Sequence, residues 1–162
     1  MKRRIFLDTN IVIDYLAKRE PFAEDAMKLF SLPEKNNQLC ISSLSFTTIY
    51  YVLKRHFQRE QLLEMLEDIQ LLTEVLPTDN DIISQAIHSE FNDFEDAVQY
   101  YTAESGQIDY IITRNPKDFT KSFIPIYTPA EFLQIPNWAH MDKSNFLNEP
   151  TEVYKTKNKS WK

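Results

Sequence analysis

The sequence predicts a three-layer α/β/α sandwich with a central parallel sheet of four to five strands. Two observations support this fold class: short apolar runs recur along the chain, and between them apolar residues repeat at spacings of three and four. Strands that are separated by helices pair in parallel through right-handed crossovers, and the helices then cover the sheet. With 162 residues, 43% of them apolar, the chain is long enough for one such domain.

The strands are expected where an apolar run is short and is bounded by polar residues. Such runs lie at residues 4–7, 39–42, 74–76, 110–113 and 124–127. Pro125 has no amide hydrogen to donate to a neighbouring strand, so the last of these strands is expected at an edge of the sheet.

The helices are expected where apolar residues form a stripe. After a helix that begins at Ile11 with Asn10 as its cap, such stripes lie at residues 22–30, 46–53, 62–69, 82–87 and 94–101. Gly106 follows the last of these stripes and is expected to end that helix in the left-handed conformation. Thr128 and Glu131 form a capping box that begins a further helix, with a proline in its first turn.

Residues 1–134 are predicted to form the domain, and residues 135–162 a C-terminal extension. The extension carries five lysines and three acidic residues, which gives it a charge of +2, whereas the first 134 residues carry −8. From Thr151 onward it shows little apolar periodicity and is expected to be a polar tail.

The composition excludes several classes of chemistry. A single glycine, Gly106, excludes glycine-rich loops that bind phosphates or nucleotides through backbone amides, and also the nucleophile elbow. One cysteine, Cys40, allows no intramolecular disulfide and no thiolate-rich metal site. The net charge of −6 argues against a protein that coats nucleic acid. Since no signal peptide or transmembrane span is predicted, a cytoplasmic location without membrane contact is expected.

Three segments are predicted to bring polar oxygens to the same edge of the sheet. Asp8 directly follows the first strand, Asp93 and Asp96 open a helix, and Asn115 and Asp118 follow the fourth strand. Ligands of such sheets collect at the carboxyl ends of the strands. Clustered carboxylates repel one another unless a divalent cation neutralises them, and oxygen ligands suit Mg²⁺ or Mn²⁺. The matching chemistry is phosphodiester hydrolysis by a metal-activated water.

Each of these acidic residues also has a purely structural interpretation. Asp93 can cap its helix with Asp96 in the first turn, Asp8 can form a cap or a salt bridge, and Asp118 can cap a turn. Another function of a doubly wound sheet is phosphotransfer through an aspartate after the first strand. A phosphatase of that kind would need a second aspartate where Asn10 stands.

Four segments of the chain form a recognisable series: LDTNI at residues 7–11, DFEDAVQY at 93–100, TRNPKDF at 113–119 and TPAEFL at 128–133. Together they resemble the PIN domain family, in the form of the VapC toxins, over about residues 3–134. The resemblance implies a metal-dependent ribonuclease that uses Mg²⁺ or Mn²⁺, often dimeric and often the toxin of a toxin–antitoxin pair. Its partners would then be RNA, an antitoxin protein and a second copy of the chain.

The resemblance also implies roles for individual residues. Asp8 matches the family's first metal-binding aspartate, and Asp96 matches the aspartate that opens the late helix. The expected catalytic residues are Asp8, Asp96, Asp93 and Asp118. The expected metal ligands are Asp8, Asp96, Asp93 and Asn115. Substrate contacts are expected from the neighbouring polar residues Asn10, Thr113 and Arg114.

Two positions depart from the family's pattern. Many PIN nucleases have a glutamate in the helix after the second strand, where this chain has Thr47 and Thr48, and many have an aspartate after Thr-Arg, where it has Asn115. Glu95 is a further acidic side chain available as a substitute. These departures favour an alternative function, a binding protein that keeps the PIN fold with weakened or lost catalysis, whereas the retained aspartates favour the ribonuclease.

Overall fold

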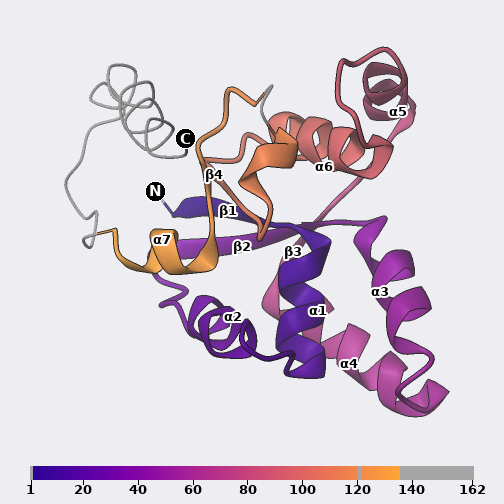
Figure 1. Ribbon diagram of the computed structural model, residues 1–162, viewed down its shortest axis with the longest axis vertical. Coiled ribbons are helices and arrows are strands. Elements are labelled where there is room, and N and C mark those ends of the chain that lie inside the picture. Colours follow the sequence, from indigo (N-terminus) through magenta and orange to yellow (C-terminus); the bar gives the residue numbers. More distant parts are fainter. Residues whose placement is uncertain (1, 120–121, 136–162) are drawn as a thin grey trace, which may run out of the picture.

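The central sheet has five parallel strands in the order β3-β2-β1-β4-β5 (Figure 1). The structure is a computed structural model, and it describes residues 2–119 and 122–135. The strands are β1 (Arg3–Leu7), β2 (Asn37–Ser42), β3 (Glu74–Leu76), β4 (Tyr110–Ile112) and β5 (Ile126–Tyr127). All five predicted strands are confirmed, with ends shifted by at most two residues. The strand that follows Pro125 is an edge strand, as its proline requires.

Helices cover both faces of the sheet, so the predicted three-layer architecture is confirmed. They are α1 (Thr9–Ala17), α2 (Ala23–Phe30), α3 (Ser45–Leu53), α4 (Arg59–Leu72), α5 (Asn80–Ile87), α6 (Phe94–Ser105) and α7 (Pro129–Leu133), with a short 3₁₀ helix, η1 (Pro116–Phe119). Figure 1 shows α5 and α6 above the sheet and the other α-helices below it. No helix in the described part of the chain is long and apolar enough to cross a membrane.

Alternating side chains of the strands build two cores. In β1, Ile5 and Leu7 point into the larger core with α1, α2, α3, α4 and α7, whereas Phe6 packs with Tyr100 of α6 on the opposite face. All three β1 residues are fully buried, and full burial of one such side chain contributes about 1.5–3 kcal/mol. The alternation of side chains along the strand therefore gives each face of the sheet its own apolar residues, which the helices of that face cover.

The position of β1 in the middle of the sheet determines where polar residues meet. Leu7 of β1 pairs with Ile112 of β4, so both strands end at the same edge. The next amide, that of Asp8, donates to the carbonyl of Ile112 at 3.0 Å. The loops that follow β1 and β4 therefore begin side by side.

Two local predictions are wrong. α1 begins at Thr9 with Asp8 as its N-cap residue, so Asn10 lies inside the helix and does not cap it. Gly106 has φ −75°, and the left-handed residue is the next one, Gln107, with φ 52°. The structure shows a different constraint on Gly106: a Cβ there would lie 2.6 Å from Cδ1 of Leu76, so the Leu76 side chain would have to shift.

The capping box predicted before the last helix is confirmed. The hydroxyl of Thr128 accepts a hydrogen bond from the amide of Glu131 at 3.3 Å, and the Glu131 carboxylate accepts from the amide of Thr128 at 3.0 Å. α7 then ends at Leu133, and Ile135 packs against the larger core. Residues 136–162 lie outside the described residues, so the division into a domain and a polar extension stays a prediction.

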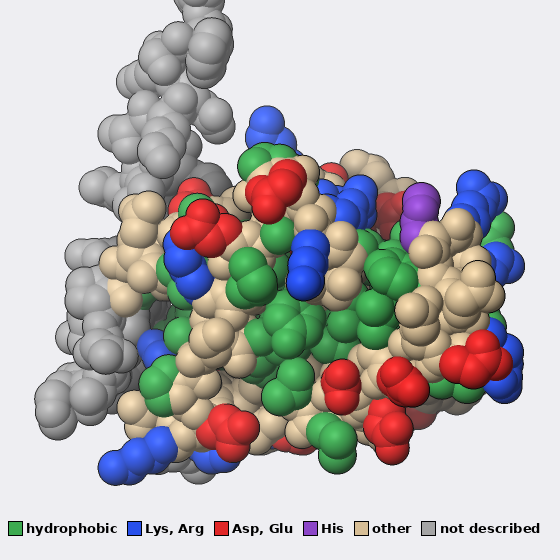
Figure 2. Space-filling view, turned by 90° about the horizontal axis from the view of Figure 1, so that it is seen from below, with side chains coloured by type: hydrophobic (Ala, Val, Ile, Leu, Met, Phe, Trp, Pro, Cys, Tyr) green, Lys and Arg blue, Asp and Glu red, His purple; other side chains and the backbone are tan. Residues whose placement is uncertain are grey.

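The face below the sheet exposes apolar side chains. Figure 2 shows them gathered over the helices of this face, with charged residues around them. Phe22 and Met27 are each 42% exposed. A groove of about 460 Å³ is lined by Ile13, Ala17, Arg19, Val52, Leu53, His56 and Phe57. Contiguous apolar surface of this kind is typical of a face that contacts another protein.

Candidate active site

Asp8 is a buried carboxylate at the end of β1, with an exposed fraction of 4%. Its Oδ2 accepts a hydrogen bond from the Thr113 hydroxyl at 2.6 Å and another from the side-chain amide of Asn10. Burial raises the pKa of Asp8, and hydrogen bonds from Thr113, Gln99 and Asn10 offset part of that rise. The hydrogen bonds that Asp8 accepts thus fix the position of its carboxylate.

The loop after β4 is tied to the start of α1. The Thr113 hydroxyl also accepts from the amide of Asn115 at 3.1 Å, and the Asn10 side-chain carbonyl accepts from the amide of Arg114 at 3.4 Å. Thr113 is fully buried, Arg114 is half-buried and Asn115 is exposed. Three residues predicted to contact substrate, Asn10, Thr113 and Arg114, therefore lie together around Asp8.

The start of α6 supplies the second group of acidic side chains. Asp93 is the N-cap: its Oδ1 accepts from the amides of Glu95 at 2.8 Å and Asp96 at 3.1 Å. The structural interpretation of Asp93 is thus confirmed, and its role as a metal ligand stays a prediction. The cap fixes the first turn of α6, and the side chain of Asp96 is half-buried there.

Asp96 lies in a strongly negative environment. Burial and the charges of Asp8, Asp93, Asp118 and Glu95 raise its pKa to about 7. Carboxylates from the end of β1, the start of α6 and η1 therefore all lie close enough to Asp96 to oppose its ionisation. A divalent cation bound nearby would favour the ionised form of Asp96.

Glu95 is a residue that the predicted site did not include among its ligands. Its pKa is raised by loss of solvation and by the charges of Asp8 and Asp93, while hydrogen bonds to the hydroxyls of Thr48 and Thr9 lower it. Glu95 of α6 thus faces Thr48 of α3, the position at which many PIN nucleases have a glutamate. The sequence signal was its place in the first turn of α6, two residues after the N-cap.

Gln99 is a second residue that the sequence analysis missed. It is only 4% exposed, and its side-chain carbonyl accepts from the amide of Thr9 at 3.2 Å. That leaves its amide group to donate to Asp8, in agreement with its effect on the pKa of Asp8. The available sequence signal was an amide side chain three residues after Asp96, one turn further along the same predicted helix.

The donor chemistry fits a hard divalent cation. The oxygens of Asp8, Asp96, Glu95 and Asp118 are of the kind that Mg²⁺ and Mn²⁺ prefer. Within residues 2–119 and 122–135, no three acidic, histidine or cysteine side chains are placed to hold one ion together. Mg²⁺ usually keeps several waters and uses one or two protein carboxylates, so a pair such as Asp8 and Asp96 is compatible with it.

A five-stranded parallel sheet with carboxylates at its carboxyl edge defines a class of small α/β proteins whose functional site lies at that edge. A family model described as "PIN domain" matches residues 4–117. That match spans more than half of the chain, and the chain therefore belongs to the PIN domain family. The resemblance seen in the sequence motifs is confirmed.

Individual relatives agree with this family. Ribonuclease VapC1 of Aquifex aeolicus (strain VF5) is 28% identical over 139 residues, which cover 81% of this chain and 94% of that protein. The structure of DNA-bound VapBC from Salmonella typhimurium matches with a TM-score of 0.61 at 24% identity, over 80% of this chain and 99% of that one. VapBC2 from Rickettsia felis, bound to a promoter DNA fragment, matches with a TM-score of 0.62 at 18% identity, over 77% and 98%. At these identities the solved structures show the shared fold.

Proposed function

We propose that this protein is a divalent-metal-dependent endoribonuclease and the toxin of a toxin–antitoxin pair. The observation that carries the proposal is the convergence of Asp8 and Asp96, where burial, the charge of Asp8 and the charges of neighbouring carboxylates together raise the pKa of Asp96 to about 7. Such a site is stabilised by a cation and suits hydrolysis of a phosphodiester. The similarity to Ribonuclease VapC1 over most of both chains supports RNA as the substrate.

In this proposal, Asp8 and Asp96 hold a Mg²⁺ or Mn²⁺ ion, with Asp93 or Asn115 as further ligands. The ion supplies an activated water and stabilises charge on the leaving oxygen. Thr113 orients the Asp8 carboxylate through its 2.6 Å hydrogen bond. Asn10 and Arg114 contact the substrate at the same edge of the sheet. Thr113 is fully buried, so the predicted substrate contact of this residue is replaced by its effect on Asp8. Asp118 adds negative charge from η1.

The test is cleavage of RNA by the purified protein. Asp8→Asn keeps the size of the side chain and removes its charge, so cleavage in the presence of Mn²⁺ should be abolished. Asp68→Asn is the matched control, because Asp68 is an exposed aspartate in α4. EDTA should stop cleavage by the unaltered protein. Undiminished cleavage by the Asp8→Asn protein would show that the site is assigned wrongly.

An alternative function, a PIN-fold binding protein without catalysis, is favoured by Thr48 and Asn115 at positions that are often acidic. Metal binding distinguishes the nuclease from the binding protein, because an ion that binds only the folded state raises the stability of the protein. A higher melting temperature in millimolar Mn²⁺ supports the nuclease. An unchanged melting temperature together with no RNA cleavage supports the binding protein.

The proposed protein partner is an antitoxin. The similar structures from Salmonella typhimurium and Rickettsia felis are VapBC complexes, and the exposed apolar face of α1 to α4 is a suitable contact surface. Co-expression with the product of a neighbouring small gene should give a stable complex whose RNA cleavage is inhibited. Sedimentation of the protein alone tests the proposed homodimer.

A further inference from the structure

Asp14, in the middle of α1, is a buried charge that the proposed active site does not use. Its exposed fraction is 0%, and neither carboxylate oxygen has a hydrogen-bond partner among the described residues. Two arginines lie beside it: Nε of Arg114 is 3.4 Å from Oδ2, and Nε of Arg19 is 3.7 Å from Oδ1. Burial raises the pKa of Asp14, and these two arginines lower it.

A buried carboxylate with two ion pairs and no hydrogen bond is a poor way to stabilise a fold. Apolar residues of similar volume are often as stabilising as a buried ion pair, or more so. The role of Asp14 therefore lies in its effect on Arg114 and Arg19. It fixes two guanidinium groups that would otherwise move freely at the surface.

Arg114 is restrained from three sides. Asp14 lies beside its Nε, the ring of Phe22 lies 4.5 Å from its guanidinium carbon, and its own amide donates to Asn10 at 3.4 Å. Asn10 in turn donates to Asp8. The guanidinium of Arg114 is therefore fixed at the border of the acidic site.

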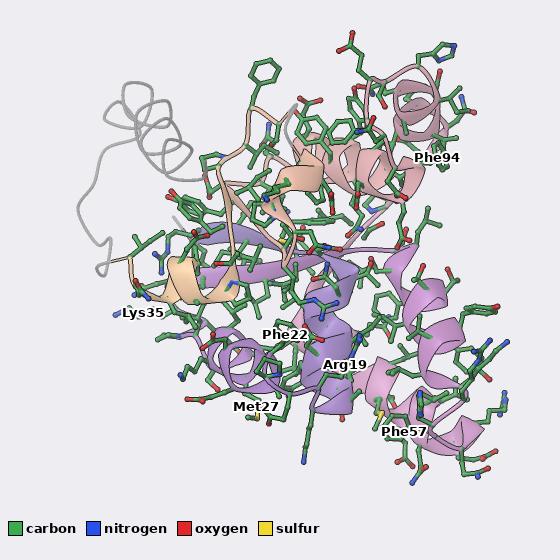
Figure 3. The ribbon with its side chains drawn as sticks, in the orientation of Figure 1. Arg19, Phe22, Met27, Lys35, Phe57 and Phe94 are labelled. Carbon is green, nitrogen blue, oxygen red and sulfur yellow. The ribbon has the colours of Figure 1, made fainter. Side chains whose placement is uncertain are left out.

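Arg19 belongs to the same group of side chains. Its carbonyl accepts from the amide of Phe22 at 2.9 Å, and Figure 3 shows Arg19 and Phe22 close together beside α1. The side chains of Arg114 and Arg19 are 23% and 47% exposed, so both reach solvent. With Asp14 counted, the group carries one net positive charge next to a cluster of carboxylates.

The geometry of Arg114 leaves most of its donors for another anion. The ion pair with Asp14 uses Nε, and a guanidinium has five N–H groups in a planar fork. Such a fork binds phosphate in two-point contacts, and a fork that is already immobilised loses less side-chain entropy on binding. A stacked arginine beside an acidic catalytic site is therefore suited to an RNA backbone phosphate.

We propose that Asp14 is a positioning residue that holds Arg114 and Arg19 where they bind a backbone phosphate of RNA beside the acidic site. This inference rests on the proposed ribonuclease function. Continuity from Arg114 through Asn10 to Asp8 favours RNA as the ligand over an acidic segment of a protein partner, because the phosphate bound there would adjoin the one that is cleaved.

Binding of a fluorescent single-stranded RNA in EDTA, where cleavage is stopped, tests this inference by the sign of the effect. Asp14→Asn removes a negative charge, so simple electrostatics predicts tighter binding and a steeper salt dependence. The positioning role predicts the reverse: weaker binding, with the slope of log Kd against log salt reduced by up to about 0.7, the value for one lost phosphate contact on a single strand.

Two further variants keep the test valid if Asp14→Asn does not fold. Arg114→Gln should reduce the same slope by about 0.7. Phe22→Leu removes the stacking partner at an exposed position and should weaken binding in the same direction, with the charge unchanged. Arg59→Gln is the control for loss of one positive charge, since Arg59 is an exposed arginine at the start of α4. Each folded variant is first checked by its melting temperature.

Activity in Mn²⁺ provides the second measurement. Asp14→Asn should raise KM more than it lowers kcat, and it should cause no further loss in an Arg19→Gln/Arg114→Gln background, where both of its partners are already absent. Tighter RNA binding by Asp14→Asn would overturn the inference while leaving the ribonuclease intact. Loss of antitoxin binding with unchanged RNA binding would also overturn it. No cleavage and no RNA binding by the unaltered protein would instead reject the proposed function.

Discussion

Replacing Asp96 by asparagine should make the metal-free protein more stable while removing its activity. At neutral pH the charge of Asp96 is opposed by burial and by four neighbouring carboxylates, which raise its pKa from the usual 3.8 to about 7. At 1.36 kcal/mol per pKa unit, this difference corresponds to about 4 kcal/mol. Because Asp96 is only half-buried and its neighbours can relax, we expect about 1–2 kcal/mol of stabilisation in the variant.

The sign of this effect depends on pH. The folded state keeps the proton of Asp96 up to about pH 7, whereas the unfolded chain loses it near pH 4, so the unaltered protein loses stability as pH rises through that interval. The asparagine side chain of the variant does not titrate. The stability difference between the two proteins should therefore be close to zero below about pH 4 and largest above about pH 7.

Urea unfolding in EDTA at several pH values between about 4.5 and 8 measures this difference, with Asp68→Asn as the control. Addition of Mn²⁺ should then stabilise the unaltered protein more than the Asp96→Asn variant. If Asp96→Asn were no more stable than the unaltered protein in the alkaline part of this range, or if its advantage did not shrink in acid, the repulsion inferred at this site would be refuted.

Two further substitutions test other parts of the structure. Glu95→Gln should lower the rate of RNA cleavage at least about tenfold if Glu95 replaces the helix glutamate of other family members, because the site then lacks an acid–base or ligand group. Glu64→Gln, at an exposed position in α4, is the control. Equal cleavage rates of the two variants would show that Glu95 does not have this role. Gly106→Ala should lower stability by about 1 kcal/mol, because its Cβ would lie 2.6 Å from Leu76 Cδ1. In a Leu76→Ala background, where only the 3.3 Å contact of the new Cβ with the carbonyl of Thr102 remains, the same change should cost less in a thermal unfolding assay.

The order of strands and helices follows from the sequence because each depends on a local period. The alternation of Ile5, Phe6 and Leu7 between two cores and the stripes of the helices need only the identities of neighbouring residues. The same holds for the capping box of Thr128 and Glu131, which is completed within one turn. The position of Asp8 was also predictable, because it directly follows a strand and all parallel strands end at the same edge of the sheet.

Features that depend on distant residues were not predictable in this way. Gly106 is constrained by Leu76, which lies thirty positions earlier, and not by its own φ angle. Asn10 hydrogen-bonds to Asp8 and Thr113 because β4 ends next to β1. That contact exists only once the sheet has formed, so a helix-capping rule assigned Asn10 a local role that the fold does not use.

The acidic site also sets a requirement for RNA binding. The charges of four carboxylates oppose the ionisation of Asp96, and these carboxylates repel a phosphate backbone as well. A bound cation would remove part of that repulsion, and the Asp14-held pair of Arg114 and Arg19 supplies positive charge at the border of the site without neutralising the carboxylates themselves. In the proposed function, separate groups thus perform the two tasks of this site: the carboxylates would retain the ion, and the buried Asp14 would hold the cationic side chains that guide the substrate to it.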